Sequence, residues 1–453
     1  MKFKKAKRYL DSLSGVKSLN LNIEGMDPVI IHMILAKNGN KREFAIVIVN
    51  GNENERYTVQ KSWAILLSIF MKFANTYGDI KITQEILEYL KERTCKETKK
   101  MFPLYSKKIA RKSLDELLNT LFAAARGDLI LENKRVVFLD NVENLAGPVS
   151  MDLLVSSIKK DGVWNCNQEC RKCYNDQDFL ARMEEMSTAE WIEVIEKIWD
   201  EAYVSQINFA GAEPTMREDL IALIKVARNF FTRLYTNGVT LSNKNYCKQL
   251  AEAKLDEVRI TLYSANPEFH NKMVGIPDGF IKTIGGIKNS LEVGIKVCVY
   301  TPIVCDNQDY VETLKFLHDL GIKNVICSGE ITAENGNSNE KELTLRGLEK
   351  ILINAARYCE ENEMKIVFSS PGLISKRFFQ KNNLEVPYCR TCISNMAIAP
   401  NGEVVPCASW LDRNISLGNI LDVPWEKIWN SFKVRILKSQ VIGNPLVCRR
   451  KMF

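Results

Sequence analysis

From residue 151 onward, short apolar segments alternate with amphipathic segments, and this alternation constrains the fold more than any other feature of the chain. The apolar segments are typical of buried strands and lie at 152–158, 206–210, 231–236, 257–262, 296–301 and 324–328. The amphipathic segments are typical of helices and lie at 188–201, 217–229, 245–253, 280–293 and 310–320. This alternation predicts parallel β/α units. Six units are too few for a closed eight-stranded barrel, so we expect an α/β fold with a partial (β/α)6 TIM-like barrel and its chemistry at the carboxyl ends of the strands.

The part of the chain before this alternation has a different pattern. The run EFAIVIVN at 43–50, followed by GNENE and RYTVQ, predicts a strand, a turn and a second strand. Three helical patterns and a second hairpin follow, at 63–77, 83–93, 112–125 and 128–140. Thr83 is expected to cap the second of these helices. Together these elements predict a winged-helix-like α+β domain.

Cysteines gather again near the end of the chain, from about residue 385. We therefore expect three domains, at 1–147, 148–384 and 385–453.

The composition of the 453 residues excludes several classes of protein. No run is long and apolar enough to span a membrane, and the basic N-terminus lacks the apolar core of a secretion signal. We therefore expect a cytoplasmic protein, in which the thirteen cysteines stay reduced. Only three histidines are present, which argues against zinc or triad chemistry based on histidine.

The charge is unevenly distributed. Residues 1–150 hold 25 Lys and Arg against 17 Asp and Glu, whereas the rest of the chain holds 37 against 38. The excess of +8 in the first part is either an ordinary solvated surface or an attraction for an acidic partner, such as an acidic peptide or nucleic acid.

Three cysteines follow the first strand of the repeat, in the sequence WNCNQECRKCYND. Cys166, Cys170 and Cys173 have the spacing C-x3-C-x2-C on a loop at a strand's carboxyl end. Three thiolates can hold three irons of a [4Fe–4S] cluster and leave the fourth iron open to a small ligand. Zinc is the structural alternative, although zinc sites favour paired C-x2-C units. Unrelated buried cysteines are the remaining alternative.

This triplet resembles the cluster-binding motif of the radical S-adenosylmethionine (radical SAM) superfamily. Three further segments resemble motifs of that family, each at the end of a predicted strand: GAEP after the second, TNG after the third and ITLYS in the fourth. The resemblance implies that the residues contacting SAM are Gly211, Ala212, Glu213, Pro214, Thr236, Asn237, Thr261 and Tyr174. Glu213 would bind the SAM ammonium group by a charge-assisted hydrogen bond.

Two positions depart from the family pattern. Ala212 replaces the usual second glycine of GGEP, which preserves space for the backbone. The aromatic residue that usually precedes the third cysteine is Lys172 here, and Tyr174 follows that cysteine instead. Either Tyr174 packs on the adenine or another group does.

The resemblance also implies the reaction and the partners. The reduced cluster of such an enzyme cleaves SAM to methionine and a 5′-deoxyadenosyl radical, which abstracts hydrogen from a substrate. A flavodoxin- or ferredoxin-type protein is the expected electron donor.

The C-terminal region resembles the SPASM or twitch extension of radical SAM enzymes, which binds auxiliary [4Fe–4S] clusters. The phrases IAPNGEVVPC and LGNI carry the resemblance, and Asn401-Gly402 predicts a hairpin turn within it. Its cysteines, which would ligate one auxiliary cluster, are Cys389, Cys392, Cys407 and Cys448. Cys448 has the alternative of a structural thiol.

Enzymes with such a tail often modify ribosomally synthesised peptides, which makes a peptide maturase our first hypothesis. The basic N-terminal domain would then recognise a leader peptide, added as a strand at 44–50. The expected partner is thus a precursor peptide with a leader, without a membrane or nucleic acid. One alternative is a cofactor-biosynthesis enzyme similar to the GTP cyclase of molybdenum-cofactor synthesis. Another is a nucleic-acid-binding regulator that senses iron or redox state. Thioether formation, carbon–carbon crosslinking, epimerisation and decarboxylation would all begin with the same hydrogen abstraction.

Overall fold

The computed structural model describes most of the chain. The residues described are 16–24, 29–35, 45–49, 56–59, 61–78, 80–126, 136–138, 147–157, 162–171, 173, 177–304, 310–329, 343–413, 415–446 and 448. They divide into two compact units. The first comprises 1–150 with 196–206 and 229–231, and the second comprises 151–195, 207–228 and 232–453.

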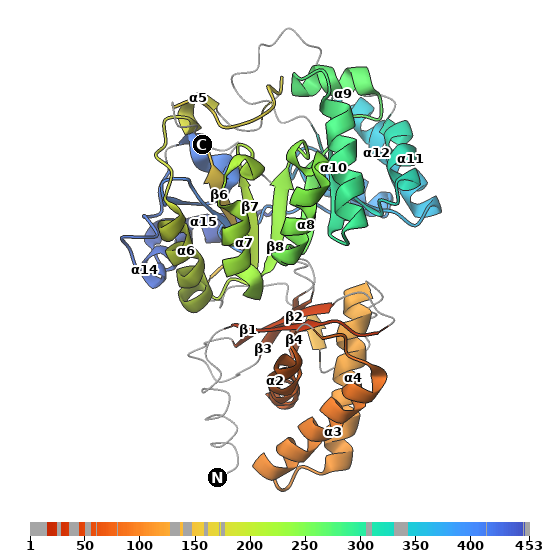
Figure 1. Ribbon diagram of the computed structural model, residues 1–453, viewed down its shortest axis with the longest axis vertical. Helices are drawn as coiled ribbons and strands as arrows, with labels where there is room; N and C mark the ends of the chain where they lie inside the picture. The colour runs from red at the N-terminus through yellow and green to blue at the C-terminus, as the bar shows by residue number, and fades with distance from the viewer. Residues whose placement is uncertain are drawn as a thin grey trace. The chain divides into compact units, whose positions relative to one another are not determined.

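Among its described residues, the first unit contains a five-stranded antiparallel sheet in the order β1-β2-β3-β4-β5 and three α-helices (Figure 1). The strands are β1 (Val16–Leu21), β2 (Val29–Leu35), β3 (Ala45–Val49), β4 (Arg56–Val59) and β5 (Val136–Phe138). The helices are α2 (Lys61–Ala74), α3 (Gln84–Met101) and α4 (Lys107–Arg126). The predicted first hairpin and three helices are present, but β1 and β2 were not predicted. Of the second predicted hairpin, only β5 lies within the described residues.

Local contacts explain where α3 begins and how it joins α4. Thr83 accepts a hydrogen bond from the backbone N–H of Ile86 at 3.3 Å, which confirms the predicted cap. Glu88 on α3 pairs with Arg111 on α4, and Lys91 on α3 pairs with Asp115 on α4 at 3.0 Å.

The predicted site of strand addition at 44–50 is wrong, because β3 is an interior strand. Hydrogen bonds to β2 and β4 occupy both of its sides. An added peptide strand needs an edge with unpaired backbone groups. The edge at β1 is itself partly occupied: Asn75 Nδ2 donates to Ser18 O at 3.0 Å, and Ile82 N donates to Asn22 O at 2.6 Å.

The barrel sheet has nine strands in the order β12-β11-β10-β9-β8-β7-β6-β13-β14. Its first six strands in the chain are β6 (Ser150–Ser156), β7 (Gln206–Gly211), β8 (Phe231–Thr236), β9 (Glu257–Thr261), β10 (Lys296–Ile303) and β11 (Asn324–Gly329). All six were predicted. The neighbouring strands from β8 to β12 pair in parallel. One further parallel strand, β12 (Lys365–Phe368), was not predicted.

Helices α7, α8 and α10 lie on one side of this sheet (Figure 1). The helices after β6 are α5 (Gln177–Leu180), α6 (Thr188–Lys197), α7 (Leu220–Val226), α8 (Lys244–Glu252), α9 (Pro267–Val274), α10 (Gly279–Glu292), α11 (Tyr310–Asp319), α12 (Leu345–Glu361), α13 (Lys376–Lys381), α14 (Trp425–Trp429) and α15 (Phe432–Gly443). On β8, β9 and β10, alternate residues such as Leu234, Val258 and Val299 are buried and apolar. The residues between them form the other face of the sheet, the inner face of the partial barrel, which is largely polar.

A partly buried carboxyl group lies just before β9. Asp256 accepts hydrogen bonds from the backbone N–H of Thr232 at 2.7 Å and from the Thr232 hydroxyl at 3.0 Å. Burial raises the pKa of Asp256 to about 7 against the effect of these two hydrogen bonds.

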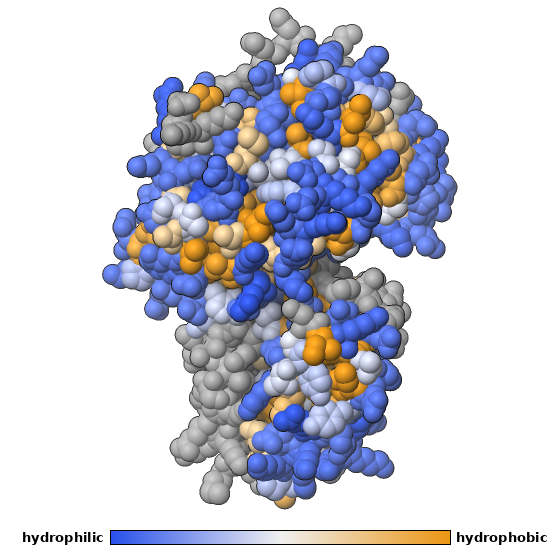
Figure 2. All heavy atoms as spheres, in the orientation of Figure 1, coloured by the Kyte–Doolittle hydropathy of each residue, from blue (hydrophilic) through white to orange (hydrophobic). Residues whose placement is uncertain are grey.

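The C-terminal region continues the barrel sheet with β13 (Asn395–Ile398) and β14 (Val404–Val405), which pair antiparallel. The predicted turn joins them, and Gly402 has φ +84°, a conformation that favours glycine. Within the described residues, no helix combines the length and apolarity of a membrane-spanning segment. The face seen in Figure 2 is mostly hydrophilic, with apolar side chains in small groups.

Candidate active site

The loop after β6 holds the three predicted cluster cysteines, all partly buried. Burial, and to a smaller extent the neighbouring thiol of Cys173, raise the pKa of Cys166 to about 11 and that of Cys170 to about 12. The three thiols are therefore close enough to interact electrostatically. Because metals bind the thiolate, loading this loop with iron must release protons.

The end of α9 fixes the position of the cysteine loop. Glu169 N donates to Val274 O at 3.0 Å, and Arg171 N donates to Met273 O at 2.9 Å. Gly275 follows with φ +73°, and a Cβ there would lie 2.4 Å from Glu169 O. Only glycine allows this approach. Glu169 and Gly275 were not predicted as site residues, although a glycine after a helix is a recognisable signal.

Glu213 joins two of the predicted motifs. Its Oε1 accepts hydrogen bonds from Thr215 N at 3.1 Å, the Thr215 hydroxyl at 2.7 Å and the Thr236 hydroxyl at 2.8 Å. Its Oε2 accepts one bond, from Asn237 N at 2.8 Å. Burial raises the pKa of Glu213, while these hydrogen bonds oppose the rise. Since a carboxylate oxygen can accept at least two hydrogen bonds, Oε2, which accepts one, retains capacity for an ammonium donor.

Asn237 extends this group to the cysteine loop. Its Nδ2 donates to Asn167 Oδ1 at 2.6 Å and lies 3.9 Å from Cys166 Sγ. The Thr283 hydroxyl donates to its backbone carbonyl at 3.0 Å. The structure therefore brings together four of the predicted residues: Cys166, Glu213, Thr236 and Asn237. Asn167 and Thr215 support this group but were not predicted, because their contacts form only when the loops that carry them meet in the fold.

Gly211 and Ala212 differ in their need for space. Gly211 has φ +133°, and a Cβ there would lie 2.3 Å from Ser156 O. Ala212 donates its N–H to the same oxygen at 2.7 Å, with its side chain in place. The departure at 212 is thus accommodated, whereas 211 requires glycine. Pro214 is buried at the start of a short 3-10 turn.

Thr261 is the last residue of β9 and pairs with Tyr300 of β10. It lies on the inner face, because it alternates with Val258 and Ile260, which are buried in the apolar core. Tyr174 and Lys172 lie outside the described residues, so the adenine contact stays a prediction.

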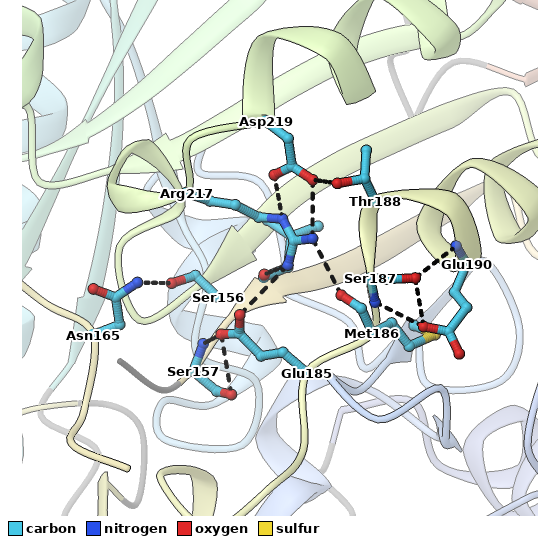
Figure 3. A network of polar contacts seen from close by, with 11 residues as sticks. Ser156, Ser157, Asn165, Glu185, Met186, Ser187, Thr188, Glu190, Arg217 and Asp219 are labelled. Atoms are coloured by element: carbon cyan, nitrogen blue, oxygen red, sulfur yellow. Dashed lines mark hydrogen bonds and ion pairs between the residues drawn. The ribbon is translucent and has the colours of Figure 1, made fainter. Parts of the chain in front are cut away.

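Arg217, just after the GAEP loop, contacts both β6 and the residues that directly precede α6 (Figure 3). Its guanidinium lies between Asp219 and Glu185, with Nε 2.5 Å from Asp219 Oδ1 and Nη1 3.4 Å from Glu185 Oε2. It also donates to the carbonyls of Val155 at 2.9 Å and Met186 at 3.1 Å. Glu185 in turn accepts from the Ser157 N–H, just before the cysteine loop. Arg217 was not predicted as a site residue, because an arginine outside a known motif gives no signal of its role in the sequence.

The C-terminal cysteines form a second group. Burial raises the pKa of Cys392 well above its usual range, and the thiols of Cys407 and Cys389 raise it further. Cys392 has φ +57°, an uncommon conformation for a non-glycine residue. Cys389 N donates to Pro445 O at 2.7 Å, which holds the segment leading to Cys448 beside Cys389.

A lysine that sequence analysis missed lies near this second group. Lys438 Nζ on α15 is 3.1 Å from the centroid of the Trp429 ring. Burial lowers the pKa of Lys438 to about 8, while the Cys392 thiolate favours its charged form.

The donor sets suit iron–sulfur clusters better than single metal ions. Among the described residues, no three His, Cys, Asp or Glu side chains are arranged to hold one metal ion. In a [4Fe–4S] cluster each cysteine binds a different iron, so its sulfurs need not converge on one point. Thiolates on two loops, with few histidines, therefore fit the chemistry of such clusters.

Two family models match the chain. The radical SAM superfamily matches residues 165–320, which include the cysteine loop and the strand ends described above. Residues 165–320 therefore form a radical SAM domain. An iron–sulfur cluster-binding domain, SPASM, matches residues 389–450, which include the four C-terminal cysteines. The protein is therefore a radical SAM enzyme with a [4Fe–4S] cluster, SAM and auxiliary iron–sulfur binding in its SPASM domain.

Solved structures share this architecture. SuiB from Streptococcus suis has a TM-score of 0.58 at 18% identity, over 89% of this chain and 88% of that chain. SuiB bound to the precursor peptide SuiA gives a TM-score of 0.58 at 16% identity, with the same coverage. The enzyme anSMEcpe with bound AdoMet has a TM-score of 0.51 at 18% identity, over 66% of this chain and 84% of that chain. These likenesses support the fold, a partial barrel with an N-terminal region and a C-terminal SPASM domain.

Proposed function

We propose that this radical SAM enzyme abstracts hydrogen from a ribosomally synthesised peptide and so introduces a crosslink, a thioether or an epimerised residue. The observation that carries the proposal is the extent of the likeness to SuiB. A match over 89% of the chain must include most of the first 150 residues, and SuiB was solved with a precursor peptide. The likeness to anSMEcpe covers only 66% of the chain.

The site residues have separate roles in this proposal. Cys166, Cys170 and Cys173 hold the cluster, which when bound and reduced supplies the electron that cleaves SAM. Oε2 of Glu213 accepts the SAM ammonium, and Asn237 holds the cluster loop against that carboxylate. The strand ends carrying Gly211, Ala212, Pro214, Thr236 and Thr261 line the rest of the SAM site, and Tyr174 packs on the adenine. The hydrogen-bond donors to Glu213 oppose the rise in its pKa that burial causes.

The C-terminal group is proposed to hold one auxiliary [4Fe–4S] cluster. Four cysteines suffice for one fully ligated cluster, and Cys389, Cys392 and Cys407 interact electrostatically. Cys448 is the proposed fourth ligand, supported by the bond from Cys389 N to Pro445 O. A fully ligated cluster has no open iron for substrate, which favours a role in accepting an electron.

Residues 1–147 are proposed as the leader-recognition domain, 148–384 as the barrel domain and 385–453 as the auxiliary-cluster domain. The charge excess of +8 in the first 150 residues supports binding of an acidic leader. Strand addition would use an outer strand of the sheet, β1 or β5, because β3 is interior. A flavodoxin- or ferredoxin-type protein is the proposed electron donor.

The test uses the full-length enzyme, purified and loaded with iron and sulfide without oxygen. Dithionite and SAM are added with a candidate precursor peptide, such as one encoded beside the enzyme. The proposal expects 5′-deoxyadenosine and a mass change in the peptide. Abundant 5′-deoxyadenosine with an unchanged peptide, together with consumption of a nucleotide such as GTP, would contradict it.

A further inference from the structure

A continuous polar chain crosses the inner face of the barrel. Asn208 on β7 donates to Asp152 on β6 at 2.6 Å, and Arg233 on β8 donates to Asn208 Oδ1 at 3.3 Å. Arg233 Nε also donates to Glu257 Oε1 on β9 at 2.6 Å. Asn395 Nδ2 on β13 reaches Asp152 from the other side at 3.0 Å. Buried polar groups of this kind are rigid when all are paired.

Arg259 is the last side chain of this hydrogen-bonded series, and one edge of its guanidinium has no hydrogen-bond partner among the described residues. Its Nε donates to Glu257 Oε1 at 2.9 Å, and its Nη1 donates to the Tyr235 hydroxyl at 2.8 Å. Its guanidinium carbon lies 5.3 Å from the centroid of the Tyr235 ring. Within the described residues Nη2 has no hydrogen-bond partner, and the side chain is 21% exposed. The group is therefore held in place while one side stays accessible.

The charges around Glu257 leave Arg259 short of a counterion. Arg233 and Arg259 share the same carboxylate oxygen, and Lys296 lies 3.8 Å from the other oxygen. Burial raises the pKa of Glu257, but the three cations outweigh it and lower the pKa to about 2. One carboxylate thus serves three cations. Asp152 on β6 accepts hydrogen bonds from the side-chain amides of Asn208 and Asn395. A guanidinium with some of its N–H groups unpaired, among three cations that share one carboxylate, favours the binding of an additional anion.

The position of Arg259 relates it to the proposed SAM site. It precedes Thr261 by two residues and shares its face of β9, about 7 Å deeper along the strand. Its register partner on β8 is Tyr235, and Asn237 follows directly after the end of that strand. An anion bound at Nη2 would therefore lie inside the barrel, beneath the strand ends.

We propose that Arg259 binds a carboxylate group of the peptide substrate, from an Asp or Glu side chain or from the C-terminus, and so selects the residue presented for hydrogen abstraction. The proposal rests on the function proposed above. Glu257 and Tyr235 are positioning residues that hold the guanidinium with Nη2 toward the interior. Planar, two-point recognition of carboxylates is a general property of arginine.

Three synthetic pentapeptides test the proposal on the SAM-bound holoenzyme by equilibrium dialysis. The first is acetylated and amidated at its ends and carries a central glutamate between two pairs of alanines. The second has glutamine in place of that glutamate, and the third is an acetylated run of five alanines with a free C-terminus. The wild type should bind one of the two carboxylate peptides about ten- to a hundredfold more tightly than the glutamine peptide. The glutamate peptide and the free C-terminus distinguish the two sources of the group.

Arg259→Met should abolish the preference, whereas Arg259→Lys should keep part of it. Lys244→Met is the matched control, because it removes a cation that pairs with Glu292 on the surface of the same unit. Cluster absorbance checks that each variant is loaded.

Equal binding of all three peptides by the wild type, or a preference that survives Arg259→Met, would overturn the proposal. So would a parallel loss of SAM affinity in Arg259→Met, because Arg259 would then hold SAM. Failure of the wild type to form 5′-deoxyadenosine would refute the proposed function separately, since peptide binding is read independently.

Discussion

Replacing Arg217 with methionine should destabilise the barrel unit by about 3–5 kcal/mol. The arginine is 10% exposed and forms an ion pair with Asp219, which is 21% exposed. Methionine keeps much of the apolar volume but leaves that carboxylate without its cation, and breaking a buried pair costs about 3–5 kcal/mol. The carbonyls of Val155 and Met186 each lose a donor as well, at about 1 kcal/mol each, although part of this is recovered by water.

Urea unfolding of the cluster-loaded enzyme, followed by circular dichroism, measures this change. Arg228→Met is the control, because Arg228 is an exposed arginine of the same unit, and its loss should change the free energy of unfolding by less than about 0.5 kcal/mol. The Arg217 network also supports the segment before the cysteine loop, so 5′-deoxyadenosine formation should slow in Arg217→Met at temperatures where the variant is folded. A destabilisation below about 1 kcal/mol would refute the assignment of Arg217 as a buried connection.

Three other changes probe the site and the barrel. Changing Cys166, Cys170 and Cys173 together to alanine should remove about four irons per chain and leave the fold, and unchanged iron content would contradict the role of this loop. Glu213→Gln should weaken SAM binding at least tenfold, measured by calorimetry, since an amide replaces a carboxylate that accepts four hydrogen bonds; unchanged affinity would show that SAM does not contact this residue. Asp256 has a pKa raised to about 7, so its contribution to stability is present at low pH and is lost as the pH rises through 7. From pH 6 to pH 8 this loss should be about 1 kcal/mol in the wild type and absent in Asp256→Asn, and equal pH dependence in the two proteins would contradict the raised pKa.

The sequence predicted the barrel strands well because each is a dense apolar run followed by an amphipathic helix. It missed β12 (Lys365–Phe368), a strand of only four residues that pairs with β11 alone. It also missed β1 and β2, which is why the prediction of strand addition at 44–50 is wrong. Strand order depends on pairing between distant segments, which a local pattern does not contain.

The motif residues of the site could be found from the sequence, but their supports could not. Glu213 lies in the recognisable tetrapeptide GAEP, and Asn237 lies in the recognisable tripeptide TNG. Arg217, by contrast, is an ordinary arginine until the fold brings Val155 and Glu185 to it. Arg259 is similar, because its importance lies in how Glu257 is shared between strands.

Formation of 5′-deoxyadenosine tests the central claim most directly. The full-length enzyme, loaded with iron and sulfide, is mixed with dithionite and SAM under anaerobic conditions, beside the variant that lacks Cys166, Cys170 and Cys173. The account predicts that the wild type releases 5′-deoxyadenosine and methionine in equal amounts and that the variant releases neither. No 5′-deoxyadenosine from fully loaded wild type, or equal amounts from both proteins, would contradict it.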